Sequence, residues 1–257
     1  MNKITGAIYE IHHMDELADR DQWVNRVHPL VKFLITLFYI ISVVSNKRLN
    51  LAGSLVMGVY PIILFMLSEL SVKDSFKRIR LIVPVICVIG VVNIFTDTTE
   101  LYVIGTFAVT TGMVSMMTLI CKGINTVLAS YLFIATTSIE KICYALRLLH
   151  IPKILVTQVL LSYRYISVLL QEVNKSVQAY ALRAPHQKGI QYRVWGSMAG
   201  QLLLRSIDRA GVVYESMVLR GFTGEFYHGK TKSCSYRDYG YLMSWTVIIS
   251  ALRLIWR

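Results

Sequence analysis

Apolar residues in the second half of the chain repeat with a helical period. Between Gly189 and Gly221 they recur at steps of four, three, four and three, at Leu203, Ile207, Ala210, Tyr214 and Met217. This spacing places the side chains on one face of a helix. The same face runs back to Gly200 and Gly196, small residues that let another helix approach closely. We therefore predict a helix over about residues 191–221, too charged to cross a bilayer, with this stripe as its packing seam.

A similar stripe lies about forty residues earlier, from Leu155 to Tyr180, and predicts a helix over about residues 153–184 that Pro185 stops. The two predicted helices end in similar four-residue sequences, which we call signatures. The first signature is Ala181, Leu182, Arg183 and Ala184, and the second is Val218, Leu219, Arg220 and Gly221. A glycine after Arg220 can end the second helix. The chain therefore presents an arginine at each of two helix ends.

The first half of the chain has long uncharged runs that are typical of membrane spans. We predict spans over residues 33–46, 49–68, 81–96 and 110–137, and a last one over 239–256. Pro61 is expected to kink the second span. Residues 101–109 are rich in β-branched and aromatic side chains and look extended, which favours one helix from Thr110 to Thr137. Two spans with a turn near Lys122 and Gly123 are the alternative.

Composition and charge agree with a membrane protein. Hydrophobic residues make up 54% of the chain and mean hydropathy is +0.51. Residues 1–139 carry 11 basic and 9 acidic groups, whereas residues 140–257 carry 16 and 6. Four spans place the N-terminus and the basic region after Ser138 on one side, and the basic loop 69–80 marks that side as cytoplasmic. No recognition module accompanies the positive charge, so nucleic acid is not an expected partner.

These patterns define the predicted fold class and domains. We expect an all-α membrane protein with about five transmembrane helices and a cytoplasmic coupling domain of one short and two long amphipathic helices. Residues 1–139 would form a lead-in and spans one to four. Residues 140–222 would form the coupling helices, the short one over 140–149. Residues 223–257 would form a loop and the last span.

Three features suggest chemistry. Lys122 would lie near mid-membrane, where an ionisable side chain marks either a functional pathway or a contact with neighbouring helices. His12, His13 and Met14 contain metal-binding side chains but have no third ligand at a suitable spacing, so no metal site is predicted. Gly224 to Thr231 fits the phosphate-loop pattern GxxxxGK[ST], but the strand that should precede such a loop is replaced by a helix.

The chain lacks a nucleophile elbow, a paired-carboxylate constellation and zinc spacing. We therefore expect neither an enzyme nor a cofactor. A rigid helix end that carries a planar cation suits a groove on another protein, where it can meet a carboxylate or backbone carbonyls. Capping of the helix carbonyls explains one such arginine, but two matching ends favour a coupling device.

Three stretches carry a family resemblance: VHPLVKFLITL, LASYLFIATTSIEKICYALRLLHIP, and the long run from YALRAPHQKG to YESMVLRGF. With the order of spans, they resemble the transmembrane T component of energy-coupling factor (ECF) transporters, most closely the cobalt type called CbiQ. In that family the coupling helices dock on two ABC ATPase subunits through paired Ala-Arg-Gly-like ends. By resemblance, Arg183 and Arg220 are the docking arginines. The first signature departs from the family pattern because Ala184 replaces glycine.

The resemblance implies further partners: a separate substrate-capturing S component (CbiM-like), a small accessory membrane subunit and membrane lipids. It implies cobalt import at the cell membrane, with ATP hydrolysed by the partners. A nickel or vitamin version of the same subunit is an alternative. A self-sufficient secondary transporter or channel that uses Lys122 is another, and a membrane enzyme is disfavoured.

Overall fold

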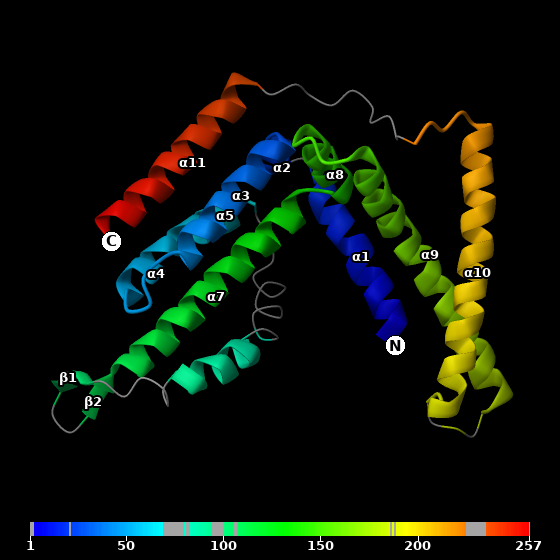
Figure 1. Cartoon of the computed structure of the whole chain (residues 1–257), viewed down its shortest axis with the longest axis horizontal. Coiled ribbons are helices and arrows are strands. Elements are labelled where there is room, and N and C mark those ends of the chain that lie inside the picture. The colour runs from blue at the N-terminus through cyan, green and yellow to red at the C-terminus, as the bar shows by residue number, and fades with distance from the viewer. Residues whose placement is uncertain are drawn as a thin grey trace. The chain divides into compact units, whose positions relative to one another are not determined.

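The structure is a computed structural model of the whole chain. It describes residues 3–20, 22–68, 80, 83–93, 100–104, 107–185, 187, 189–224 and 235–256. The basic loop predicted at residues 69–80 falls outside this set, apart from Arg80. Most described residues are helical, which confirms the predicted class, and the described strands form one short hairpin (Figure 1).

The elements follow one another as Figure 1 labels them. The helices are α1 (Lys3–Asp19), α2 (Trp23–Arg26), α3 (Pro29–Val44), α4 (Leu51–Met57), α5 (Val59–Leu67), α7 (Thr111–Thr136), α8 (Ile139–Leu148), α9 (Lys153–Arg183), α10 (Tyr192–Leu219) and α11 (Tyr236–Ile255). A further apolar helix covers Val83–Asn93. Strands β1 (Glu100–Ile104) and β2 (Phe107–Thr110) pair antiparallel.

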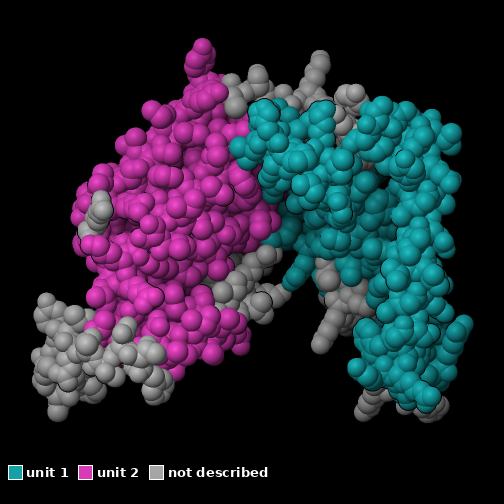
Figure 2. All heavy atoms as spheres, in the orientation of Figure 1, with its two compact units in different colours: residues 1–17, 139–231 teal, residues 18–138, 232–257 magenta. Residues whose placement is uncertain are grey.

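The chain divides into two compact units, coloured separately in Figure 2. Unit 1 contains residues 1–17 and 139–231, and therefore most of α1 with α8, α9 and α10. Unit 2 contains residues 18–138 and 232–257, and therefore the apolar helices of the first half with α11. Each unit thus joins segments that lie far apart in the sequence.

In unit 2, α3 packs against both α7 and α11. Apolar side chains on α3 recur at steps of four, so Val31, Ile35 and Tyr39 lie on one buried face. The ring of Tyr39 lies 4.4 Å from that of Tyr60, which meets Trp245 of α11 edge to face at 4.8 Å. Such aromatic pairs add about 0.5–1.5 kcal/mol each beyond their area burial.

Polar contacts fix the ends of α3 to its neighbours. The backbone N–H of His28 donates to Asp238 Oδ1 at 3.2 Å, and Asp238 also completes a capping box with Ser235 at the start of α11. Burial lowers the pKa of His28, and the charge of Asp238 partly opposes this shift. At the far ends, Arg253 of α11 donates to Ser45 Oγ at 2.8 Å. The two helices therefore run in the same direction.

The second apolar run is interrupted at Gly58, between α4 and α5, and not at Pro61 as predicted. Proline has no N–H, so Pro61 cannot donate to the carbonyl of Met57, four residues earlier. Tyr39 supplies the missing donor at 2.9 Å. The N–H of Gly58 donates to the carbonyl of Leu55 and not to that of Ser54, four residues earlier. Asn125 Nδ2 of α7 donates to the carbonyl of Ser54 in its place, at 2.7 Å. The effect of Pro61 thus appears one turn upstream.

One continuous helix, α7, follows the hairpin, and it has no turn near Lys122 and Gly123, where the two-span alternative places one. Its bounds lie one residue inside the predicted Thr110 to Thr137. Strand pairing from Glu100 to Thr110 agrees with the extended conformation expected there.

The lead-in, expected to be amphipathic or irregular, forms a regular helix over Lys3–Asp19, most of it in unit 1. Tyr163 of α9 donates a hydrogen bond to Asp15 Oδ1 of α1 at 2.6 Å. Helix α8 ends in a Schellman turn: Ile151 N–H donates to Leu146 O, and His150 adopts a left-handed φ of 61°. The turn leads directly into α9.

Candidate functional site

Both signatures lie at exposed helix ends in unit 1. Arg183 is the last residue of α9, and Arg220 is the C-cap of α10. The leucines that precede them are among the most exposed large apolar side chains, Leu182 at 83% and Leu219 at 88%. Both arginines are exposed as well. Each end therefore offers an apolar side chain followed by a cation to another surface.

The two helices stop by different means. After α10, Phe222 N–H donates to Met217 O and Gly221 N–H to Val218 O, with Gly221 at φ +81°. This is a Schellman motif, and its left-handed position favours glycine.

After α9, the capping residue Ala184 has φ −131°, a conformation open to any residue. Pro185 then prevents continuation of the helix. Tyr180 also donates to Gln187 Oε1 at 2.7 Å and fastens the connection. Alanine therefore replaces glycine at 184 without backbone strain.

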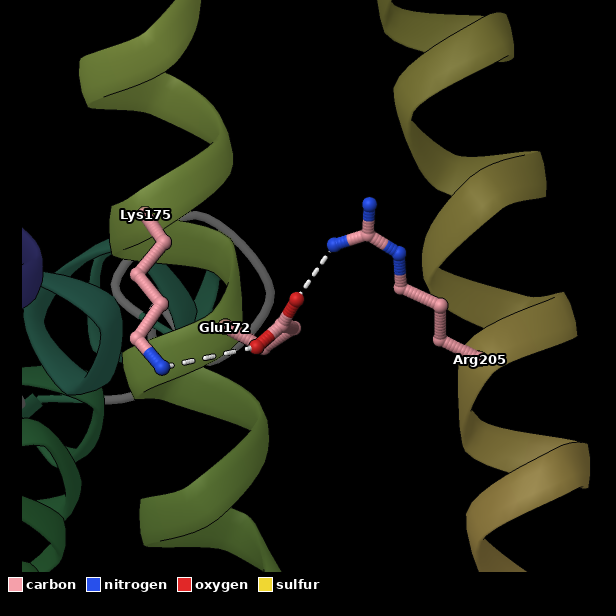
Figure 3. A network of polar contacts seen from close by, with 3 residues as sticks. All are labelled: Glu172, Lys175 and Arg205. Carbon is pink, nitrogen blue, oxygen red and sulfur yellow. Dashed lines mark hydrogen bonds and ion pairs between the residues drawn. The ribbon is translucent and has the colours of Figure 1, made fainter.

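Helices α9 and α10 lie side by side and antiparallel (Figure 1). Midway along them, Glu172 accepts from Arg205 of α10 and lies 3.9 Å from Lys175 of its own helix (Figure 3). Near the start of α9, Thr157 Oγ1 donates to the carbonyl of Gly224 at 3.3 Å. Since 26 residues separate Thr157 from Arg183, the two signatures lie at opposite ends of this hairpin, about 39 Å apart along α9.

The predicted seam of α10 is exposed: Leu203 at 60%, Ile207 at 58% and Tyr214 at 62%, with Ala210 also exposed and Met217 half-buried. A Cβ added at Gly196 or Gly200 would meet no atom within 4 Å. The half-buried face of α10 shares only Met217 with this seam; its other members are Val194, Met198, Leu202, Ser206 and Val213. Packing of another helix against the seam remains a prediction.

Lys122 makes a specific structural contact. Its Nζ donates to the carbonyls of Asn46 at 2.6 Å and Val44 at 3.3 Å, where α3 ends. A cation favours this position because carbonyls at a helix C-terminus carry partial negative charge. The reverse contact also exists: buried Lys32 of α3 donates to the carbonyl of Thr136, the last residue of α7, at 2.9 Å. The two antiparallel helices cap one another through lysines.

The remaining candidates add no site. In the described parts of the chain, no group of three His, Cys, Asp or Glu side chains could hold a metal ion. His13 stacks on Tyr9 at a ring distance of 6.0 Å. Residues 225–231 of the phosphate-loop pattern lie outside the described residues.

Among the described helices, α7 and α9 are long and apolar enough to cross a membrane by length and composition. Helix α3, the α4–α5 run and the helix Val83–Asn93 are shorter apolar segments. Only 6% of the most apolar window of α9 is buried, against 28% for α7. Much of the apolar surface of α9 is therefore available to lipid or to another chain.

The exposed apolar helices are typical of a membrane protein. Residues 20–232 match the family described as cobalt transport protein, CbiQ, and the chain belongs to this family. Two relatives are similar in sequence. Nickel permease LarQ of Lactiplantibacillus plantarum is 29% identical over 48% of this chain and 44% of its own length. Uncharacterized protein MJ1571 of Methanocaldococcus jannaschii is 24% identical over 86% of this chain and 78% of its own.

Proposed function

We propose that this chain is the membrane coupling subunit of an ECF-type importer for a divalent transition-metal ion, cobalt or nickel. Two ABC ATPases would supply the energy, and a separate S component would capture the metal. Membership of the cobalt transport family and the name of the nickel relative support the substrate class. The ATPase and S-component partners follow from the resemblance given above.

The observation that carries the proposal is the pair of exposed Leu-Arg helix ends, Leu182-Arg183 and Leu219-Arg220. Exposed apolar and guanidinium groups gain most from burial in a groove that offers a carboxylate or carbonyls. Because they lie at opposite ends of the α9–α10 hairpin, each end would meet a different ATPase. Closure of the ATPases on ATP would displace both ends and move the hairpin as a body.

We place α9 outside the bilayer although its first half is apolar. Its second half carries Glu172, Lys175 and Arg183, and charges in lipid are expensive. Partner chains, not lipid, would then cover the exposed faces of α9 and α10. Residues 140–222 would form this coupling domain in the cytoplasm, and residues 1–139 and 223–257 would supply about five spans.

The test combines the double variant Arg183→Ala and Arg220→Ala with the partner subunits in membrane vesicles. We expect the variant to insert normally and to reduce ATP-driven uptake of radioactive cobalt or nickel at least tenfold. The matched control is Arg164→Ala with Arg209→Ala, which removes two exposed arginines from the middles of the same helices. Control uptake should stay within twofold of the parent.

Normal uptake by the first variant contradicts the coupling role of the helix ends. Uptake by this chain alone, without ATPases, would instead support a self-sufficient transporter. Lys122 lends that alternative no support, since its ammonium group is engaged with the end of α3.

A further inference from the structure

Four cations gather at the turn that joins α3 to α4 in unit 2. Lys47 and Arg48 belong to the turn and are exposed. Lys122 of α7 donates to its carbonyls at residues 44 and 46, and Arg253 of α11 donates to Ser45 Oγ. We call these four residues the turn cluster. Three separate segments of the chain contribute to it.

Described carboxylates lie elsewhere in unit 2. Two acidic side chains are described in this unit: those of Asp19 and Asp238. Asp238 lies at the start of α11, bonded to His28 at the other end of α3. Asp19 precedes α2, near that same end.

Like charges held together repel, and the charge of Arg48 acts on Lys122. The carbonyls at the end of α3 offset part of the Lys122 charge. Among the described residues, no carboxylate pairs with Lys47 or Arg48. An anion bound at the turn would relieve the repulsion, and a phosphate oxygen suits both ammonium and guanidinium donors.

A stripe of exposed apolar side chains leads away from the turn cluster along α3. It consists of Leu37, Ile41 and Val44, spaced by four and three residues and exposed at 45%, 54% and 61%. Helices α7 and α11 both pack against α3, and these three side chains stay exposed. Lys122 bonds the end of α3, so a lipid head group at the turn would place Lys122 at head-group depth and not near mid-membrane as predicted. A cationic position above an apolar stripe then matches the two ends of a phospholipid.

We propose that the turn cluster binds the phosphate of an anionic phospholipid, with an acyl chain along the α3 stripe. Charge complementarity favours this occupant over a zwitterionic lipid, because four cations attract a head group with a net negative charge more strongly than one with no net charge. Lys47 and Arg48 make the main contacts, since both are exposed. Arg253 and Lys122 hold the turn in place and complete the positive surface.

The test measures lipid binding to the full purified chain in detergent by native mass spectrometry and by the shift in Tm. The probes are dioleoyl phosphatidylglycerol, dioleoyl phosphatidylcholine and inorganic phosphate. We expect phosphatidylglycerol to bind at least tenfold more tightly than phosphatidylcholine. Lys47→Gln with Arg48→Gln should weaken its binding about 25-fold, since each surface cation contributes about fivefold.

The matched control is Arg164→Gln with Arg209→Gln, which removes the same charge from exposed positions in unit 1. It should leave phosphatidylglycerol affinity unchanged. An unchanged Tm of each lipid-free variant shows that the fold is retained. A second comparison uses Arg253: Arg253→Lys keeps the positive charge and should bind phosphatidylglycerol more tightly than Arg253→Gln, which removes it. Equal binding of the two lipids, or equal loss in the control, overturns the proposal. Inorganic phosphate binding as tightly as the lipid overturns the acyl-chain contact.

Discussion

Polar side chains are buried between helices in unit 2, whereas those of α9 and α10 in unit 1 are not. In unit 2, buried donors such as Lys32, Tyr39 and Asn125 each meet a backbone carbonyl on another helix. In unit 1, α10 has no buried residue and α9 has one, Val156. The ion pair between these helices, Glu172 with Arg205, is itself partly exposed. Polar groups therefore secure the fold in unit 2, whereas α9 and α10 of unit 1 leave most of their side chains at least partly exposed.

This contrast separates stability from function. Removing a buried donor leaves its carbonyl unsatisfied and lowers the free energy of unfolding. Removing an exposed charge changes it little. The four experiments below test this division, from the largest expected effect to the smallest.

Lys32→Met should have the largest effect, because it removes the charged cap from the end of α7 and leaves Thr136 O without this donor. We expect a loss of about 2 kcal/mol in the free energy of unfolding, measured by urea titration in detergent micelles. Lys32→Arg keeps the charge and should recover more than half. A loss below about 0.5 kcal/mol would show that α7 does not depend on this cap.

Tyr39→Phe removes only a hydroxyl, yet that hydroxyl supplies the bond that Pro61 cannot give to Met57 O. We expect a loss of about 1–1.5 kcal/mol in the same titration. Tyr192→Phe, at a tyrosine that is 94% exposed, is the matched control and should change nothing measurable. Equal effects at the two tyrosines would remove the distinction between buried and exposed donors.

His150→Gly is expected to stabilise unit 1, because glycine adopts the left-handed φ of this position without strain. The gain should be about 0.5–1 kcal/mol, seen as a higher Tm by differential scanning calorimetry. Leu149→Gly, one residue earlier and not at positive φ, should instead destabilise by about 1 kcal/mol. A lower Tm for His150→Gly would contradict the strain argument.

The pair Glu172 and Arg205 should contribute least. A double-mutant cycle with Glu172→Gln and Arg205→Gln should give a coupling energy of about 0.5 kcal/mol at low salt. High salt should abolish it, because exposed pairs are screened. A coupling above about 2 kcal/mol would mean that this pair is part of a buried interface.

Continuous patterns made much of the fold predictable. The bounds of α7, α9 and α10 lie within two residues of those expected, because each helix is bordered by an extended segment, a proline or a glycine. The break at Gly58 was missed because Pro61 acts through Met57, one turn upstream. The partner of Lys122 could not be predicted, since it belongs to a segment 76 residues away.

The candidate site was predictable in part. Sequence alone located both signatures at helix ends, and their docking role remains a prediction. Their separation follows only once α9 and α10 are known to be antiparallel. Glu172 and Arg205 were missed, although they stand at nearly equal distances in sequence from the connection at residues 184–191, which is the register of a hairpin.

The unequal stops of α9 and α10 have a consequence for assembly. One arginine precedes an alanine and a proline, and the other precedes a glycine in a left-handed turn. If both helix ends dock on ATPases as proposed, two copies of one ATPase would have to bind chemically different helix ends in identical grooves. With two different ATPases, each groove could instead fit its own helix end. Exchanging residues 181–184 with residues 218–221 would distinguish the two cases, because it should disturb docking only where the two grooves differ.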